Sequence, residues 1–290
     1  MNLIYQGGSE IPVSNPKISI GMPVYQAEKY IRRALDSLLG QTYANFELII
    51  SDNASNDETS KICQEYANLD NRIKYVRQQI NRGAAGNFEF VLNAASGEYF
   101  MWAAHDDIWS PDFIQINLLF LESNKDYVAS VCPVRFDDGD FEPIHMGDLP
   151  LTGLPYQRFE QFFNCWHANS RFYSLFRTQE LKVCPYYGVD FLGSDWVIML
   201  YVIMQGKMNR AATGSMVRGH QGFSNSGKIL KHYRKKWIHW FLPLSELCLI
   251  TLKMSAAFPV KHWFTIIYLL AKFNWQVLRA AIVNIAQQRN

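Results

Sequence analysis

Short apolar runs alternate with amphipathic segments over the first 110 residues of the chain. Four apolar runs have the length and composition of strands, and they lie at 17–21, 46–51, 73–76 and 98–102. After the first run, apolar residues recur with the spacing of one helix face, at Ile31, Ala34, Leu35, Leu38 and Leu39, and Gly40 follows as a natural stop. Further helices are expected at 57–69 and 87–95. Strands that alternate with helices predict an α/β fold with a parallel sheet covered on both faces.

The pattern is less regular beyond residue 108. Helices are expected at 111–121 and 193–204, with a strand at 127–136 between them. The second helix begins near Ser194, a residue type that favours helix N-termini. Residues 137–165 are rich in Gly, Pro and Asp, and residues 210–227 are rich in Gly and Ser. Both stretches are therefore expected to form loops.

The charge of the chain is distributed unevenly. Residues 1–195 carry 15 basic and 25 acidic side chains, whereas residues 228–290 carry ten basic side chains and one acidic side chain, Glu246. Within this last stretch, one stripe of an expected helix is polar or basic, and it consists of Lys261, Thr265, Lys272, Gln276 and Arg279. Aromatic and aliphatic residues occupy the rest of the helix, which makes it amphipathic.

Two interpretations of residues 228–290 remain open. They could form a helical subdomain that packs on the rest of the chain, or a region that rests on an anionic membrane surface. We favour the membrane, because anionic head groups attract Lys and Arg and because Trp prefers the membrane interface. Nucleic acid would also match the charge, but here the aromatic residues lie among aliphatic ones, so we expect no nucleic-acid partner.

The composition limits the class of protein. A length of 290 residues with 49% hydrophobic residues suits one large α/β domain, or a domain of roughly 200 residues with an appendage. The five cysteines form no C-x-x-C pair, which argues against a disulfide framework or a zinc site and favours a reducing compartment. The sequence has neither a secretory leader pattern nor an apolar run of about 18 residues. We therefore expect a cytoplasmic protein that lies peripherally on the inner face of the cell membrane.

Candidate chemistry lies where the predicted strands end, at residues 22–27, 52–57 and 103–107. Ligands of parallel sheets bind beyond the carboxyl ends of the strands. Asp52 could accept a hydrogen bond from a nucleobase N–H, or it could form an Asx turn. Asp106 and Asp107 could hold Mg²⁺ or Mn²⁺ against a diphosphate, or they could cap the helix that follows. Asp195 could act as a general base, or it could complement the dipole of its helix.

The order of several segments resembles the family 2 glycosyltransferases of the GT-A fold over about residues 16–225. These segments are Ile18–Gly21, Pro23–Tyr25, Ile49–Asp57, Asn81–Gly83 and Tyr99–Asp112. The resemblance implies a Rossmann-like domain that binds a nucleotide-sugar at residues 17–227. A lead-in at 1–16 would precede this domain, and the helical C-terminal region at 228–290 would follow it.

The resemblance also implies roles for individual residues. Asp52 would contact the nucleobase, in a pocket shaped by Pro23 and Tyr25, and Arg82 would belong to the donor site. The family pattern D-x-D reads Ala104-His105-Asp106 here, so the first carboxylate is missing and His105 could supply the ribose contact instead. Asp106 matches the aspartate that typically binds the metal.

Three further residues complete the expected site. Asp107 and His220 are additional metal candidates. The family has a Glu-Asp pair where this chain has Ser194-Asp195, so Asp195 matches the general base while Ser194 replaces the glutamate.

The resemblance implies inverting transfer from a UDP-sugar or dTDP-sugar to a glycan or lipid-linked acceptor, with Mn²⁺ or Mg²⁺ as cofactor. A nucleotidyltransferase remains an alternative, but that class usually has a glycine-rich turn with a basic residue after the first strand, where this chain has Met22–Tyr25. A catalytically silent nucleotide-sugar-binding protein is the second alternative, because Ala104 and Ser194 replace expected acidic residues.

Overall fold

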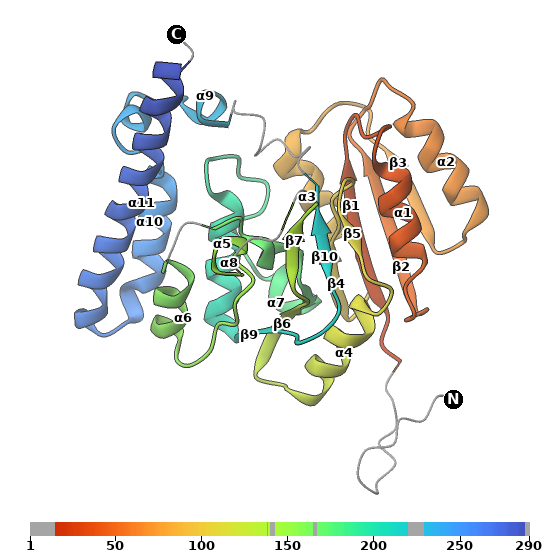
Figure 1. The fold of residues 1–290 in the computed structure, drawn as a ribbon, viewed down its shortest axis with the longest axis horizontal. Helices are drawn as coiled ribbons and strands as arrows, with labels where there is room; N and C mark the ends of the chain where they lie inside the picture. The colour runs from red at the N-terminus through yellow and green to blue at the C-terminus, as the bar shows by residue number, and fades with distance from the viewer. Residues whose placement is uncertain (1–14, 138, 140–142, 165–166, 220–228, 288–290) are drawn as a thin grey trace, which may run out of the picture.

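A computed structural model describes residues 15–137, 139, 143–164, 167–219 and 229–287 (Figure 1). Its centre is a seven-stranded sheet with the strand order β3-β2-β1-β4-β8-β6-β9. The strands are β1 (Ile18–Val24), β2 (Phe46–Asp52), β3 (Ile73–Arg77), β4 (Tyr99–Trp102), β6 (Tyr127–Val131), β8 (Leu175–Arg177) and β9 (Lys207–Arg210).

The expectation of a parallel sheet is confirmed for β1 to β4, which pair in parallel with β1 between β2 and β4. Further along, where the sequence pattern predicts no strand direction, β8 lies antiparallel between β4 and β6. β8 has only three residues, which is too short to leave a periodic signal in the sequence.

A second sheet includes one strand from a stretch where the sequence predicts a loop. Its three strands have the order β5-β10-β7, and they are β5 (Ile108–Trp109), β7 (Val134–Phe136) and β10 (Met216–Arg218). Met216 pairs with Trp109 on one side and with Val134 on the other. The prediction that residues 210–227 form a loop is therefore wrong at β10, which brings residues 216–218 next to the segment that follows β4.

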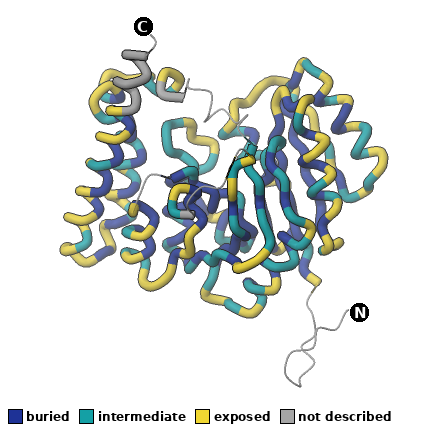
Figure 2. The backbone as a smooth tube through the Cα atoms, viewed as in Figure 1, coloured by how far each residue is buried: buried dark blue, intermediate teal, exposed yellow. Residues whose placement is uncertain are grey.

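Helices cover both faces of the main sheet, as the alternating pattern predicts (Figure 1). Those of the first half are α1 (Ile31–Leu39), α2 (Thr59–Leu69), α3 (Gly83–Asn93) and α4 (Phe113–Ser123). Successive residues of β2 belong to different cores: Leu48 and Ile50 pack with α1 and α4, whereas Ile49 packs with α3 on the other face. β1 and β2 are consequently buried on both sides, and the exposed residues of the molecule lie mainly on the outer helices and loops (Figure 2).

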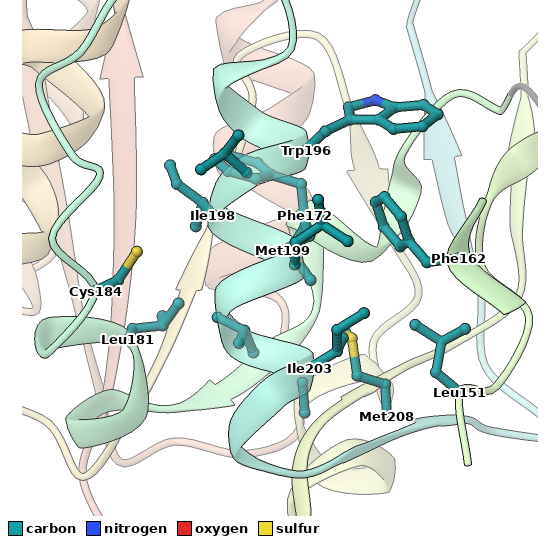
Figure 3. Close-up of a cluster of buried hydrophobic side chains, with 14 of the residues drawn as sticks. Leu151, Phe162, Phe172, Leu181, Cys184, Trp196, Ile198, Met199, Ile203 and Met208 are labelled. Atoms are coloured by element: carbon teal, nitrogen blue, oxygen red, sulfur yellow. The ribbon is translucent and has the colours of Figure 1, made fainter. Parts of the chain in front are cut away.

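The larger core surrounds α8 (Ser194–Gln205), whose residues 196–200, 202 and 203 are all buried (Figure 3). A helix that is apolar on all sides must be covered on all sides. The cover comes from the sheet and from α6 (Pro155–Phe162), α10 (Ser245–Met254) and α11 (Val260–Gln287). The prediction of a loop over 137–165 is wrong at α6 and at α5 (Pro143–Met146), which are two short helices.

The C-terminal helices share this core with the rest of the chain. Ile266, Leu270 and Phe273 of α11 are buried in it. His262 stacks on Tyr156 with ring centroids 3.8 Å apart, and its Nδ1 lies 2.8 Å from Glu160 Oε1. One face of α11 is thus packed as a subdomain helix would be. Within the described ranges, no helix combines the length and the apolar character that crossing a bilayer requires.

The remaining short elements within the described residues connect these parts. They are α7 (Thr178–Lys182), α9 (Ile229–Tyr233) and three 3₁₀ turns, η1 (Ser170–Tyr173), η3 (Trp237–Trp240) and η4 (Ser255–Ala257).

Candidate functional site

Asp52 lies at the carboxyl end of β2 and is completely buried. Its Oδ1 accepts a hydrogen bond from the Ser55 N–H at 2.9 Å, and its Oδ2 accepts one from the Tyr75 hydroxyl at 3.0 Å. Arg77 Nε lies 3.5 Å from Oδ2. The bond to Ser55 spans three residues, whereas the Asx turn that the sequence leaves open as an alternative would join Asp52 to the N–H two residues on. The contact between Asp52 and a nucleobase stays a prediction. The hydrogen bonds from Ser55 and Tyr75 already fix the orientation of the Asp52 carboxylate.

The other expected donor residues surround the same edge of the sheet. Pro23 is buried in β1 opposite Ser51, and Tyr25 follows β1 with its side chain 43% exposed. The Arg82 N–H donates to Asn53 Oδ1 at 2.8 Å, which ties the start of α3 to the loop after β2. The Arg82 guanidinium lies 5.4 Å from the Phe90 ring centroid. These residues line the carboxyl ends of β1 and β2, where the strand pattern places them.

Asp106 and Asp107 follow β4 and have different environments. Asp107 is buried, and its Oδ1 accepts a hydrogen bond from the Gly219 N–H at 3.0 Å. Burial raises the pKa of Asp107 to about 7, although Arg218 lies close enough to oppose the shift. Asp106 is partly exposed and lies directly against Gly219, where a β-carbon would come within 2.6 Å of Asp106 Oδ2.

His105 lies next to this pair. Burial lowers its pKa, whereas the nearby charges of Asp106 and Asp57 act in the opposite direction. A neutral imidazole can donate or accept a hydrogen bond, which suits the ribose contact that the resemblance implies. That role stays a prediction.

Asp195 occupies the first turn of α8, after Gly193 with φ +90°. Its Oδ2 accepts a hydrogen bond from Asn169 Nδ2 at 2.8 Å. Asn169 is buried and has φ +51°, a left-handed conformation that asparagine adopts more readily than most residues. Burial raises the pKa of Asp195, and the hydrogen bond from Asn169 opposes that shift. The carboxylate is therefore oriented and partly desolvated.

Tyr173 and Arg218 connect the two groups of carboxylates. The Tyr173 phenol is buried, which raises its pKa, and the charges of Asp107, Asp106 and Asp195 all reach it. Arg218 lies 5.2 Å from the Tyr173 ring centroid and donates to the Ala168 carbonyl at 2.8 Å. Asp106 and Asp195, which are far apart in the sequence, thus both lie near Tyr173. The sequence pattern gave no signal for Tyr173 or Asn169, which lie in a stretch without periodicity.

The expected metal site can be tested against this geometry. Among the described residues, no group of three His, Cys, Asp or Glu side chains could hold a metal ion alone, and His220 lies outside the described residues. Mg²⁺ and related ions commonly use one or two carboxylates and complete their shell with phosphate and water oxygens. Asp107 Oδ2 is buried and accepts no hydrogen bond from the described part of the chain. Asp106 and Asp107 therefore fit a site that a diphosphate would complete.

Curated relatives match a little over a third of the chain. This chain is 38% identical over 117 residues to the uncharacterized glycosyltransferase RT0329 of Rickettsia typhi. The matched stretch covers 40% of this chain and 36% of that protein. The chain is 36% identical over 99 residues to glycosyltransferase GlyA of Streptococcus pneumoniae, covering 34% of this chain and 14% of that protein. The match thus spans much less than two thirds of these relatives' own length.

Solved structures match more of the chain at lower identity. Residues 1–349 of S. aureus TarS, in complex with UDP-GlcNAc, superpose with a TM-score of 0.65 at 19% identity, covering 89% of this chain and 71% of that one. The mannosyltransferase PcManGT from Pyrobaculum calidifontis, in complex with GDP-Man and Mn²⁺, gives a TM-score of 0.63 at 16% identity, covering 95% and 76%. These similarities confirm the expected fold class, an α/β domain of GT-A type with a helical C-terminal region.

The sequence model of one family covers more than half of the chain. Residues 19–182 match the family described as glycosyl transferase family 2. This range contains β2 to β4, all of β1 except Ile18, and both Asp52 and Asp106. The family that the motifs suggest is therefore confirmed, and this chain belongs to glycosyl transferase family 2.

Proposed function

We propose that this chain transfers a sugar from a nucleotide diphosphate donor to a hydroxyl group of an acceptor, with inversion at the anomeric carbon. The observation that carries the proposal is the convergence of Asp106, Asp107 and Asp195 around Tyr173 and Arg218. Family membership and the position of Asp106 and Asp107 beyond the carboxyl end of β4 support it.

The donor would lie across the carboxyl ends of β1, β2 and β4. Asp52 would accept a hydrogen bond from the base, with Pro23 and Tyr25 beside it, and a UDP- or dTDP-sugar is the expected donor. Structural neighbours that hold UDP-GlcNAc or GDP-Man support a nucleotide diphosphate sugar as the ligand class. Arg82 and His105 would contact the phosphate or ribose part of the donor.

Asp106 and Asp107 would hold Mn²⁺ or Mg²⁺. When bound, such an ion neutralises the charge that develops on a diphosphate leaving group. Gly219 supports this assignment, because the absence of its side chain leaves room for the Asp106 carboxylate. His220 is the residue after Gly219 in the sequence and stays a third candidate.

Asp195 would act as the general base. Its carboxylate takes the proton from the acceptor hydroxyl as that oxygen attacks the anomeric carbon, and the bond to the diphosphate oxygen breaks on the opposite side. A single base and a direct displacement produce inversion. A raised pKa suits this task, because it brings the proton affinity of the carboxylate closer to neutral pH.

The acceptor would be a growing polysaccharide or a lipid-linked saccharide on the inner face of the cell membrane. A silent nucleotide-sugar-binding protein would bind the same donor without consuming it. Turnover of a donor sugar, including slow hydrolysis without acceptor, separates an enzyme from such a protein. Release of pyrophosphate from a nucleoside triphosphate would instead favour a nucleotidyltransferase.

A set of three variants tests the assignment of roles. A thermal-shift screen of nucleotide sugars with Mn²⁺ first identifies the donor. Asp106→Asn should then lose metal-dependent binding of the nucleoside diphosphate in calorimetry. Asp195→Asn should keep that binding and lose transfer by roughly 10²–10⁴-fold.

The control is Asp126→Asn, at a side chain that is 59% exposed and pairs with Lys207 at the start of β9. It should behave like the unmodified protein in both assays. If Asp195→Asn turns over within a few-fold of the unmodified chain, the base lies elsewhere.

A further inference from the structure

The helix α11 carries two apolar stripes, and only one of them is packed. Phe273 is completely buried, as are Ile266 and Leu270 nearby on the same face. Phe264 and Trp275 are 72% and 63% exposed. At 3.6 residues per turn, these two positions lie within about 20° of each other around the helix and on the side opposite Phe273. A helix that served only to cover α8 would need no aromatic residues on its outer side.

Exposed aromatic residues are concentrated in this part of the molecule. Of the 20 large hydrophobic side chains that are exposed among the described residues, 11 lie between residues 237 and 275. On α11 they include Ile267 and Tyr268, which are 49% and 67% exposed. The exposed stretches of α10 and α11 form one lateral edge of the molecule (Figure 2). Contiguous exposed apolar surface of this kind marks an interaction site.

Basic side chains flank the exposed stripe. Lys261, Lys272 and Arg279 lie about 60–80° around the helix from Phe264, all on the same side. Within the described part of the chain, none of the three forms an ion pair with a carboxylate. The one acidic residue of the C-terminal region, Glu246, pairs with Lys236 Nζ at 2.9 Å and with His239 Nε2 at 3.1 Å. The edge therefore keeps an uncompensated positive charge next to its aromatic residues.

We propose that this edge docks on an anionic lipid surface. We define the outer stripe of α11 by what it presents to solvent, four apolar and three basic side chains: Phe264, Ile267, Tyr268, Trp275, Lys261, Lys272 and Arg279. Interfacial helices present aromatic and aliphatic residues to the acyl boundary and basic residues to anionic head groups. A second copy of the chain fits less well, because two identical basic flanks would repel each other.

The position of the stripe is compatible with access to the candidate site. Figure 1 shows α11 along one side of the molecule. The C-terminal end of α11 and the short helix α9 lie at the same end of the molecule as the carboxyl end of β1. A lipid surface along this side would lie beside the loop that carries Asp106 and the first turn of α8 that carries Asp195, without covering them. The docking inference rests on the exposed residues and their charge, and it stands independently of the proposed transfer reaction.

The test is co-sedimentation of the full chain with vesicles. One set contains phosphatidylcholine alone, and the other also contains phosphatidylglycerol. The unmodified chain should sediment with the anionic vesicles at low salt, and binding should weaken as salt rises, because ions screen the attraction. Each Lys or Arg near such a surface contributes about fivefold to partitioning. The charge variant Lys261→Gln/Lys272→Gln/Arg279→Gln should therefore bind about a hundredfold more weakly.

The aromatic variant tests the apolar part of the stripe. Phe264→Ser/Tyr268→Ser/Trp275→Ser should lose binding to both kinds of vesicle at any salt concentration. It should keep its circular dichroism spectrum, since all three side chains are largely exposed. The matched control is Leu69→Ser/Val183→Ser, which removes apolar side chains that are 85% and 56% exposed elsewhere. This control should bind as the unmodified chain does.

Three outcomes would overturn the proposal. The first is a full chain that stays in the supernatant with anionic vesicles at low salt. The second is an aromatic variant that binds as the unmodified chain does. The third is a concentration-dependent dimer in sedimentation velocity that the aromatic variant abolishes, without vesicle binding, which would assign the stripe to a second copy. Binding of UDP with Mn²⁺, measured on the same variants, reports on the donor site separately and should not change.

Discussion

The hydrogen bond from Asn169 to Asp195 leads to the sharpest prediction about the base. The substitution Asn169→Gly removes the donor, while glycine keeps the left-handed backbone conformation that Asn169 adopts at φ +51°. An alanine at this position would add backbone strain of about 1–2 kcal/mol and confuse the result. The change is therefore confined to the amide group that contacts Asp195 Oδ2 at 2.8 Å.

The direction and size of the effect follow from the charge of the carboxylate. A hydrogen bond to an ionised group contributes about 1.5–3 kcal/mol, and it stabilises the charged form of Asp195. Its loss raises the pKa of Asp195 further, because the effect of burial is then less opposed. A free energy of about 1.5–3 kcal/mol corresponds to a change of about 10- to 150-fold in the proton affinity of the Asp195 carboxylate. The general base acts only when deprotonated, so the acid limb of the pH–rate profile should move toward higher pH.

Two measurements check the prediction. The titration of the Asp195 carboxyl, assigned by NMR with Asp195→Asn as the blank, should shift upward in Asn169→Gly. The pH dependence of kcat/KM for transfer should shift in the same direction, with a loss of turnover that is largest on the acid side. Asn71→Ala changes an exposed asparagine and serves as the control. An unchanged titration in Asn169→Gly would refute the idea that Asn169 tunes the base.

Three further predictions concern other residues. Asp107→Asn should stabilise the metal-free fold above pH 7 by on the order of 4 kcal/mol at most. Because the pKa of Asp107 is raised to about 7, its contribution to the stability of the unmodified chain is present at acid pH and is lost as the pH rises through that value. Thermal melts of Asp107→Asn and of the unmodified chain from pH 4 to pH 8 should therefore converge at the acid end. Gly219→Ala should weaken Mn²⁺-dependent UDP binding in calorimetry, because the new β-carbon would collide with Asp106; unchanged binding would argue against Asp106 as the ligand. Phe273→Ala should cost about 3–5 kcal/mol in urea unfolding, whereas Trp275→Ala on the outer side should cost less than about 1 kcal/mol; equal losses would contradict the assignment of the two faces.

The first four strands could be predicted from the sequence because each is a short segment rich in aliphatic or aromatic residues and bounded by polar or small residues. β8 and β10 have three residues each, and their pairing depends on distant partners that no local pattern reveals. The helix α6 was missed because its surroundings are rich in turn-forming residues, although Phe159 and Phe162 anchor it in the core.

The candidate site divides in the same way. Asp52 and Asp106 each follow a predictable strand, so their place at the carboxyl edge of the sheet could be inferred from the sequence alone. Asp195 lies on α8, which belongs to another part of the chain, and only the packing of η1 and β10 brings it toward Asp106. Asn169 could not be identified, because its role depends on a left-handed backbone conformation and on a contact 26 residues away.

The C-terminal region shows why a helix pattern alone could not decide between a packed subdomain and a membrane-binding segment. α11 has apolar residues around most of its circumference, so its period does not say which face is buried. The structure assigns Phe273 to the core, where its ring centroid lies 5.6 Å from that of Trp196, the residue next to Asp195.

A chain that ended near residue 226 would therefore lose part of the packing behind the candidate base as well as the outer stripe. Loss of transfer in such a truncated chain could not be ascribed to lost membrane binding. Only substitutions confined to the outer stripe separate the two roles of α11, since they leave the Trp196–Phe273 contact in place.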